Sequence, residues 1–179
     1  MKAMATLYTI GHSTRTIEEL IASLQSHDIK TLVDIRAFPM SRRLPHFNRE
    51  NLEKSLGEAG IRYVWMKELG GMRKKSLHES PNIALRNASF RNYADYMLTP
   101  EFENAAAHLI QLAKHSPTAY MCAERVYFKC HRMLVSDWLV AHGHEVLHID
   151  DVKPPKPHKL MPDARMVEDK LIYRGDRLL

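Results

Sequence analysis

The feature that most constrains the fold is a strand-like run, a polar loop and a helical pattern that follow one another between Thr118 and Gly143. The run 118–122 is mostly apolar and begins directly after Pro117, as is typical of a buried strand. The helical pattern ends at Gly143, a common C-terminal stop, and its apolar residues recur at helical spacing: Leu134, Val135, Trp138 and Leu139. In open α/β proteins ligands bind beyond the C-terminal ends of parallel strands, so the loop after this strand is the expected place for a site.

Strand-like runs and helical patterns alternate along the rest of the chain. Thr16 and Glu19 form the capping box of one helix, and Asn48 precedes another that ends at Glu58. The further strand-like runs cover 6–10, 31–35, 61–65 and 145–149. This alternation predicts an α/β fold, a three-layer sandwich around a mainly parallel sheet of about five strands.

Length and composition indicate one domain. A chain of 179 residues is long enough to enclose a full core. We expect residues 1–150 to form the α/β domain and the Pro- and Lys-rich segment 151–179 to form a tail packed on it. The apolar runs are too short to cross a membrane, and the first residues lack the pattern of a signal peptide. The sequence therefore predicts a cytoplasmic protein with no membrane partner, and it does not indicate an oligomeric state.

If the sheet is parallel, the C-terminal ends of several strands meet at one edge. The catalytic candidates expected at this edge are Cys122, Glu124, Asp34 and Cys130. A thiolate is favoured near a helix N-terminus and near cations, and two carboxyl groups in different surroundings can serve as acid and base. The structural alternatives are that Cys122 is a small core residue and that Asp34 pairs with Arg36 or Arg132.

Basic residues gather in the loops near the same edge. The range 36–49 holds several arginines and no acidic residue before Glu50, and Arg is suited to bidentate contacts with phosphate. The residues that we expect to bind the substrate are His12, Ser13, Arg36, Ser41, Arg42, His131 and Arg132. The formal charge of +5 and the pI near 9.2 are compatible with an anionic small molecule or a nucleic acid as partner. The alternative is a solvated basic surface.

A metal site is a further interpretation of the same residues. Cys122, Cys130, His131 and His12 supply the ligand types of tetrahedral zinc. The spacing Cys-x7-Cys-His matches no usual zinc finger or ribbon. We therefore expect no metal and no cofactor.

The motifs resemble those of the family called domain of unknown function 488. The residues that carry the resemblance lie between about 6 and 175 and are Tyr8 to Ser13, Asp34-x-Arg36, Pro39-x-Ser41, Tyr63 to Gly71, Phe90 to Met97, and Cys122-Ala-Glu124 with Cys130-His-Arg132. The resemblance implies an α/β fold and a motif set, and no reaction. A weaker similarity is to rhodanese and cysteine-phosphatase domains, but there the Arg follows the Cys by about six residues, and here Arg132 follows Cys122 by ten.

Two functions from different classes fit these residues. The first is an enzyme that acts on an anionic, phosphate-containing substrate, a nucleotide or nucleic acid, at a Cys/Glu/Arg pocket on the C-terminal edge of the sheet. The alternative is a non-catalytic nucleic-acid-binding or adaptor module in which the Cys/Glu/Arg cluster is structural. The sequence leaves open which of the two holds, and so whether the protein is an enzyme.

Overall fold

The computed structural model describes residues 3–174 and is built around a mainly parallel sheet. In chain order its strands are β1 (Thr6–Gly11), β2 (Thr31–Asp34), β3 (Arg62–Trp65), β4 (Thr118–Cys122), β5 (Glu145–His148) and β6 (Lys156–Pro157). In space they follow the order β3-β2-β4-β1-β5-β6. All pairings are parallel except that of β6, which runs antiparallel to β5. The predicted α/β sandwich is confirmed.

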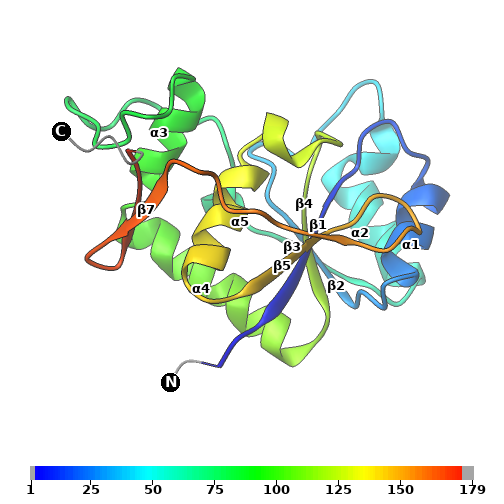
Figure 1. The fold of residues 1–179 in the computed structure, drawn as a ribbon. Coiled ribbons are helices and arrows are strands. Elements are labelled where there is room, and N and C mark those ends of the chain that lie inside the picture. Colours follow the sequence, from blue (N-terminus) through cyan, green and yellow to red (C-terminus); the bar gives the residue numbers. More distant parts are fainter. Residues whose placement is uncertain (1–2, 175–179) are drawn as a thin grey trace.

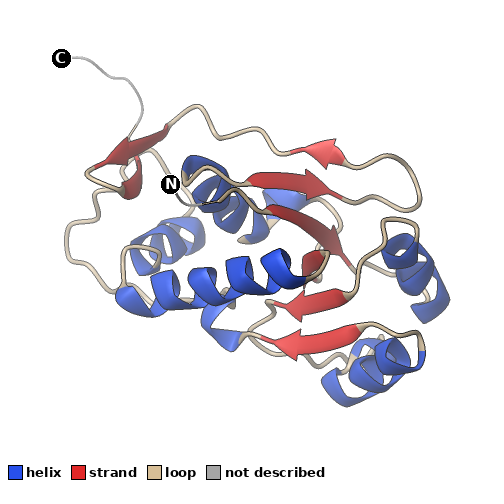
Figure 2. Ribbon diagram, turned by 90° about the horizontal axis from the view of Figure 1, so that it is seen from below, coloured by secondary structure: helices blue, strands red, loops and turns tan. Residues whose placement is uncertain are grey.

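Helices cover both faces of the sheet (Figure 1). They are α1 (Ile17–Gln25), α2 (Arg49–Glu58), α3 (Ala88–Tyr96), α4 (Pro100–His115) and α5 (Arg132–Ala141), with short 3₁₀ turns η1 (Pro45–Phe47), η2 (Lys67–Leu69) and η3 (Tyr127–Lys129). Helices α1 and α2 lie on one face, and α3, α4 and α5 lie on the other, as Figures 1 and 2 show. No helix in residues 3–174 is both long and apolar enough to cross a membrane.

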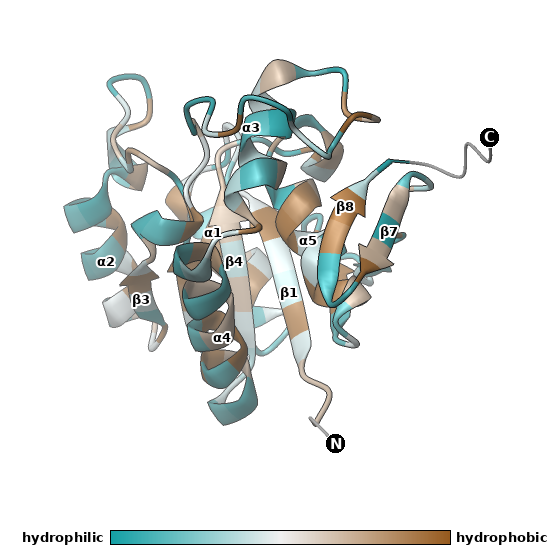
Figure 3. Cartoon of the chain, turned by 90° about the vertical axis from the view of Figure 1, so that its left-hand side faces the viewer, coloured by the Kyte–Doolittle hydropathy of each residue, from teal (hydrophilic) through white to brown (hydrophobic). Residues whose placement is uncertain are grey.

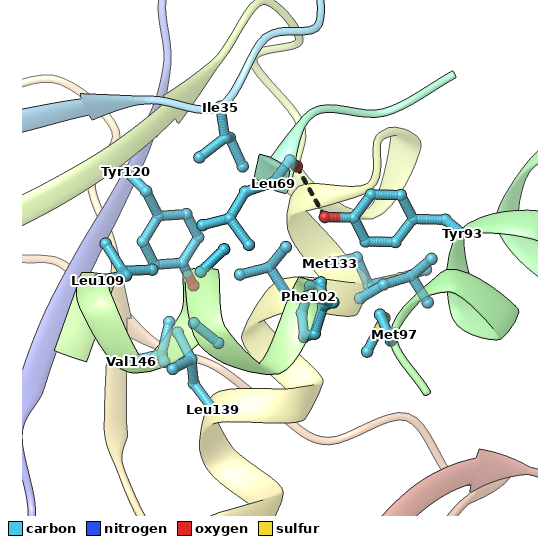
Figure 4. Packing of buried hydrophobic residues seen from close by; sticks show 14 of the residues in the cluster. Ile35, Leu69, Tyr93, Met97, Phe102, Leu109, Tyr120, Met133, Leu139 and Val146 are labelled. Atoms are coloured by element: carbon cyan, nitrogen blue, oxygen red, sulfur yellow. Dashed lines mark hydrogen bonds between the residues drawn. The ribbon is translucent and has the colours of Figure 1, made fainter. Parts of the chain in front are cut away.

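Alternating side chains of the central strands divide the core into two clusters. Tyr120 of β4 packs with residues of α4 and α5, while its neighbour Met121 packs with residues of α1 and α2. Figure 4 shows Tyr120 among Leu109 and Leu139 in the larger cluster. The helices turn their apolar sides inward and keep polar residues on their outer surface, which is clear for α4 in Figure 3. Burial on both faces is what the apolar central strands predict.

The helix ends follow the sequence signals in most places. The Thr16 hydroxyl accepts from the Glu19 amide at 3.1 Å, and the Glu19 carboxylate accepts from the Thr16 amide at 2.9 Å. Asn48 stands before α2 as expected, but its side chain does not cap that helix. Its Oδ1 instead accepts a 2.5 Å hydrogen bond from the Ser41 amide, so it holds the preceding arginine-rich loop.

The segment after β5 crosses back over the domain. Beyond β6 it forms a hairpin of β7 (Ala164–Val167) and β8 (Lys170–Tyr173) beside α3 (Figure 1). Tyr173 accepts a hydrogen bond from the Ala84 amide at 2.8 Å and donates one to Asn82 Oδ1 at 2.9 Å. The tail predicted over 151–179 extends to residues 175–179, which lie outside the described part of the chain.

Candidate active site

A cavity of about 750 Å³ lies at the C-terminal edge of the sheet. Gly11 at the end of β1 is level with Cys122 at the end of β4, and Asp34 at the end of β2 is level with Met121. The loops that follow these strands therefore open at one place and form the cavity wall. The predicted residues on that wall are His12, Ser13, Arg36, Ser41, Cys122, Glu124, Cys130 and His131. Asp34, Arg42 and Arg132 are not on it.

Two cysteines face each other across the loop between β4 and α5. Their sulfur atoms are 2.7 Å apart, and both thiols are free. Cys122 is 2% exposed, whereas Cys130 is half-buried. The contact with Cys122, with His131 and Arg132 nearby, lowers the pKa of Cys130 to about 4. The same contact and burial raise the pKa of Cys122. Cys130 is therefore the thiolate of the pair at neutral pH.

His131 stands beside this thiolate with a defined tautomer. Its Nε2 lies 2.9 Å from the carbonyl oxygen of Ile35. A carbonyl only accepts, so Nε2 carries the proton and Nδ1 is the nitrogen that interacts with Cys130. Nδ1 also faces Gly71, where an added Cβ would lie 3.0 Å away. The neighbouring glycine therefore leaves room for the imidazole.

Asp34 is held in a buried ion pair. Its carboxylate accepts from Arg36 Nε at 2.9 Å and from Arg36 Nη2 at 2.7 Å. It also accepts from the Tyr63 hydroxyl at 2.6 Å, and it is fully buried. This is the pairing with Arg36 that the sequence analysis gave as the alternative to catalysis. The Arg36 guanidinium, which also donates to the Phe47 carbonyl at 2.8 Å, is thereby fixed at the cavity wall.

His12 is neutral and receives a hydrogen bond from the same arginine. Its Nδ1 lies 2.8 Å from the Ser13 carbonyl and so carries the proton, and its Nε2 accepts from Arg36 Nη1 at 3.3 Å. Burial, with Arg36 close by, lowers the pKa of His12 to about 4. His12 therefore adds a hydrogen-bonding group to the cavity wall but no charge.

Arg132 supports the loop rather than the cavity. It is 1% exposed, and its Nη2 donates to the carbonyl oxygens of Glu124 at 2.8 Å and Arg125 at 3.0 Å. The same loop rests on the end of β1, where a Cβ added to Gly11 would lie 1.7 Å from the Glu124 carbonyl oxygen. Glycine is therefore required at that close approach.

A buried chain of hydrogen bonds continues from Arg132 toward the C-terminal segment, and the sequence analysis missed it. Arg132 Nη1 donates to Thr9 Oγ1 at 3.0 Å. From Thr9 the chain runs through His148 (2.7 Å), His158 (2.8 Å) and Asp137 (2.6 Å) to the Tyr173 hydroxyl (2.9 Å). Thr9 lies near the start of the sequence and the other members lie between residues 132 and 173 with no common spacing, so no sequence signal connects them.

Two of the charged residues on the cavity wall are available for a ligand. Within residues 3–174 neither Glu124 nor Arg43 takes part in an ion pair, and both are exposed. Arg125, by contrast, pairs with Asp150 at 2.9 Å and with Asp151 at 3.4 Å. Arg42 was the residue of the basic loop expected to bind the substrate, whereas its neighbour Arg43 is the one on the wall.

The geometry does not bring metal ligands together. Among the described residues no group of three or more His, Cys, Asp or Glu side chains is placed to hold a metal ion. His12 and His131 each engage one ring nitrogen with a backbone carbonyl, as described above.

The sequence of the chain matches one known protein family. The model of the family DUF488, described as a domain of unknown function, matches residues 16–139. The chain belongs to the DUF488 family. The DUF488 match includes Asp34, Arg36 and the Cys122 to Arg132 loop, and it excludes His12 and Ser13. A search of curated proteins and a search of solved structures found no match. Similarity to rhodanese or cysteine-phosphatase domains is not shown.

Proposed function

We propose that this DUF488 protein is a cysteine-dependent enzyme that acts on an anionic, phosphate-containing substrate in the cavity at the C-terminal edge of the sheet. The observation that carries the proposal is the half-buried Cys130 thiol on the cavity wall, with its pKa lowered to about 4 beside His131. A thiolate at neutral pH is a strong nucleophile, and a neighbouring imidazole is the usual partner of a reactive cysteine.

Charge supports an anionic substrate. Arg36 and Arg43 line the cavity, and the single carboxylate on its wall belongs to Glu124. Arg36 is held in place by Asp34, so its guanidinium costs little further ordering when a ligand binds. Arg43 is an exposed lining residue on the loop after β2. Guanidinium groups form bidentate hydrogen bonds with phosphate oxygens, and this favours a phosphate-bearing ligand over a neutral one.

The residues support a two-step reaction. In the first step the Cys130 sulfur forms a bond to the electrophilic atom of the substrate, and the leaving group departs with the electron pair of the broken bond. The imidazole of His131 passes a proton to the leaving group. In the second step water attacks the covalent intermediate, the Glu124 carboxylate accepts a proton from it, and the thiolate is regenerated.

Protection of Cys130 from alkylation tests whether the cavity binds phosphate. Iodoacetamide should modify Cys130, and inorganic phosphate, a nucleoside monophosphate or a short oligonucleotide should slow the reaction. Turnover is tested with a panel of phosphate-bearing esters, on which Cys130→Ser should abolish activity that Arg42→Ala retains. Absence of protection by all three ligands would overturn the proposal. Protection by the oligonucleotide alone, with steep salt dependence and no turnover, would establish the non-catalytic nucleic-acid-binding module instead.

A further inference from the structure

Cys122 and Cys130 are close enough to form a disulfide bond. Cys122 ends a strand, Cys130 lies directly before the N-terminus of α5 at His131, and the loop between them returns so that the sulfur atoms are 2.7 Å apart. A disulfide has an S–S distance of about 2.05 Å, so closing the bond requires a movement of less than 1 Å. Both residues are anchored by regular secondary structure on the side away from the loop.

The geometry points to a reversible dithiol–disulfide site formed by Cys122 and Cys130, in which Cys130 meets an oxidant from the cavity and Cys122 resolves it. This inference does not rest on the proposed function, because it concerns the two thiols alone and needs no substrate. It assigns a role to Cys122, a residue that borders the cavity although it is only 2% exposed.

Exposure gives the two sulfurs different roles. Cys130 is half-buried on the cavity wall, so a small oxidant in solution reaches it first. Cys122 lies behind it at the end of β4, where solvent does not reach, yet it is in contact with the Cys130 sulfur. The lowered pKa of Cys130 and the raised pKa of Cys122 agree with this division between an attacking thiolate and a thiol held in reserve.

The chemistry balances with a peroxide as the oxidant. The Cys130 thiolate attacks one peroxide oxygen, the O–O bond breaks, and hydroxide leaves, so that a sulfenic acid forms on Cys130. The Cys122 sulfur then attacks the Cys130 sulfur, the S–O bond breaks, and the oxygen leaves as water with the proton from Cys122. Two electrons pass from the two sulfurs to the peroxide. A low-molecular-weight dithiol reverses the change by thiol–disulfide exchange.

Oxidation would also change the cavity. The disulfide removes the thiolate from the wall and ties the end of β4 to the residue before α5. The amide of Arg132, which donates to the Cys130 sulfur at 3.3 Å, loses its charged acceptor. The oxidised protein therefore has a cavity of nearly the same shape without a nucleophile.

Intact-protein mass spectrometry tests the inference directly. The chain has 2 cysteines, so an intramolecular disulfide can only be this pair. After one equivalent of hydrogen peroxide the wild type should lose the mass of two hydrogens and both titratable thiols, remain monomeric on a non-reducing gel, and recover with dithiothreitol. Cys122→Ser should accumulate a sulfenic acid on Cys130 that dimedone traps. In Cys130→Ser oxidation of Cys122 should slow by at least about tenfold, because a buried thiol replaces a thiolate.

The measurement on the wild type tests the inference even if a cysteine substitution impairs folding. Circular dichroism of each variant shows whether it is folded before its thiols are counted. Over-oxidation of Cys130 with Cys122 still free, a disulfide that links two chains, or two thiols that persist through the peroxide treatment would each overturn the inference.

Discussion

His131 Nε2 donates a 2.9 Å hydrogen bond to the carbonyl of Ile35, and this contact joins the loop after β2 to the start of α5. The bond sets the orientation of the imidazole and leaves its other nitrogen for the Cys130 sulfur. The imidazole beside Cys130 is thus positioned by two segments that are far apart in the sequence.

Loss of His131 should make Cys130 less acidic. In the wild type the rate of Cys130 alkylation should stay high from pH 8 down to about 5, because its pKa is lowered to about 4. In His131→Gln the midpoint of the rate profile should move to higher pH, since the imidazole is one cause of the lowered pKa. His142→Gln, near the other end of α5, is the matched control and should keep the wild-type profile. An unchanged midpoint in His131→Gln would show that Cys122 and the N-terminus of α5 are enough to lower the pKa of Cys130.

Arg43 and Arg42 form a matched pair of variants. Both are exposed, but only Arg43 lies on the cavity wall. Arg43→Ala should weaken phosphate protection of Cys130 by about tenfold, the value of one lost charge-assisted hydrogen bond. Arg42→Ala should bind as the wild type does, and both should keep their unfolding free energy within about 0.5 kcal/mol. Equal losses in the two variants would indicate a diffuse basic surface instead of a defined site.

Asp34 should be essential for stability. Asp34→Ala removes the partner of the buried Arg36 guanidinium and should lower the unfolding free energy by about 3–5 kcal/mol. Tyr63→Phe removes one hydrogen bond to the same carboxylate and should cost about 2 kcal/mol. Urea unfolding followed by circular dichroism measures both. An Asp34→Ala protein that is stable but inactive would return this residue to the catalytic group.

Stability should fall as the pH drops through the acid range. The pKa of His12 is lowered to about 4 and that of His148 to about 3, in both cases chiefly by burial. Between these values and the ordinary histidine pKa of about 6.5 the unfolded chain binds more protons than the folded one. The melting temperature should therefore be highest above pH 6.5 and decrease toward pH 4. Replacing His148 with Gln should flatten this slope, whereas His78→Gln, at an exposed position, should not.

Two glycines should respond to alanine in opposite ways. Gly11→Ala places a Cβ 1.7 Å from the Glu124 carbonyl, so the loop that carries Glu124 must shift, and both stability and Cys130 reactivity should fall. Gly57, in the last turn of α2, has no atom within 4 Å of an added Cβ. Gly57→Ala should raise the unfolding free energy by up to about 1 kcal/mol through helix propensity. Thermal unfolding and alkylation rates of the two variants provide the comparison.

The sequence predicted what depends on local pattern. Apolar runs such as 118–122 became strands of a mainly parallel sheet, and the pairing of Thr16 with Glu19 marked a true helix start. The meeting of Asp34 and Cys122 at one edge followed from the parallel order alone. Periodicity and capping signals are short-range, so they can be read without knowledge of the fold.

The sequence could not predict which loop residues reach the cavity, because that depends on the direction of their side chains. Arg42 and Arg43 are adjacent and chemically identical, and only the course of the loop places one on the wall. Arg132 carries the charge expected of a ligand-binding residue, but its guanidinium turns inward to backbone carbonyls. His148 and His158 meet because an antiparallel β6 follows β5, and no local signal announced that pairing.

The hydrogen-bond chain from Arg132 to Tyr173 also has a consequence for biosynthesis. Synthesis from the N-terminus produces the strand that ends in Cys122 and the helix that follows it before His158 and Tyr173, so this hydrogen-bond chain can be completed only once residue 173 is present. Until then Asp137 lacks its partners His158 and Tyr173, whereas Arg132 can already hold the loop through the Glu124 and Arg125 carbonyls. The surroundings of Cys130 are therefore complete only after residue 173 has been added, later than both cysteines of the pair.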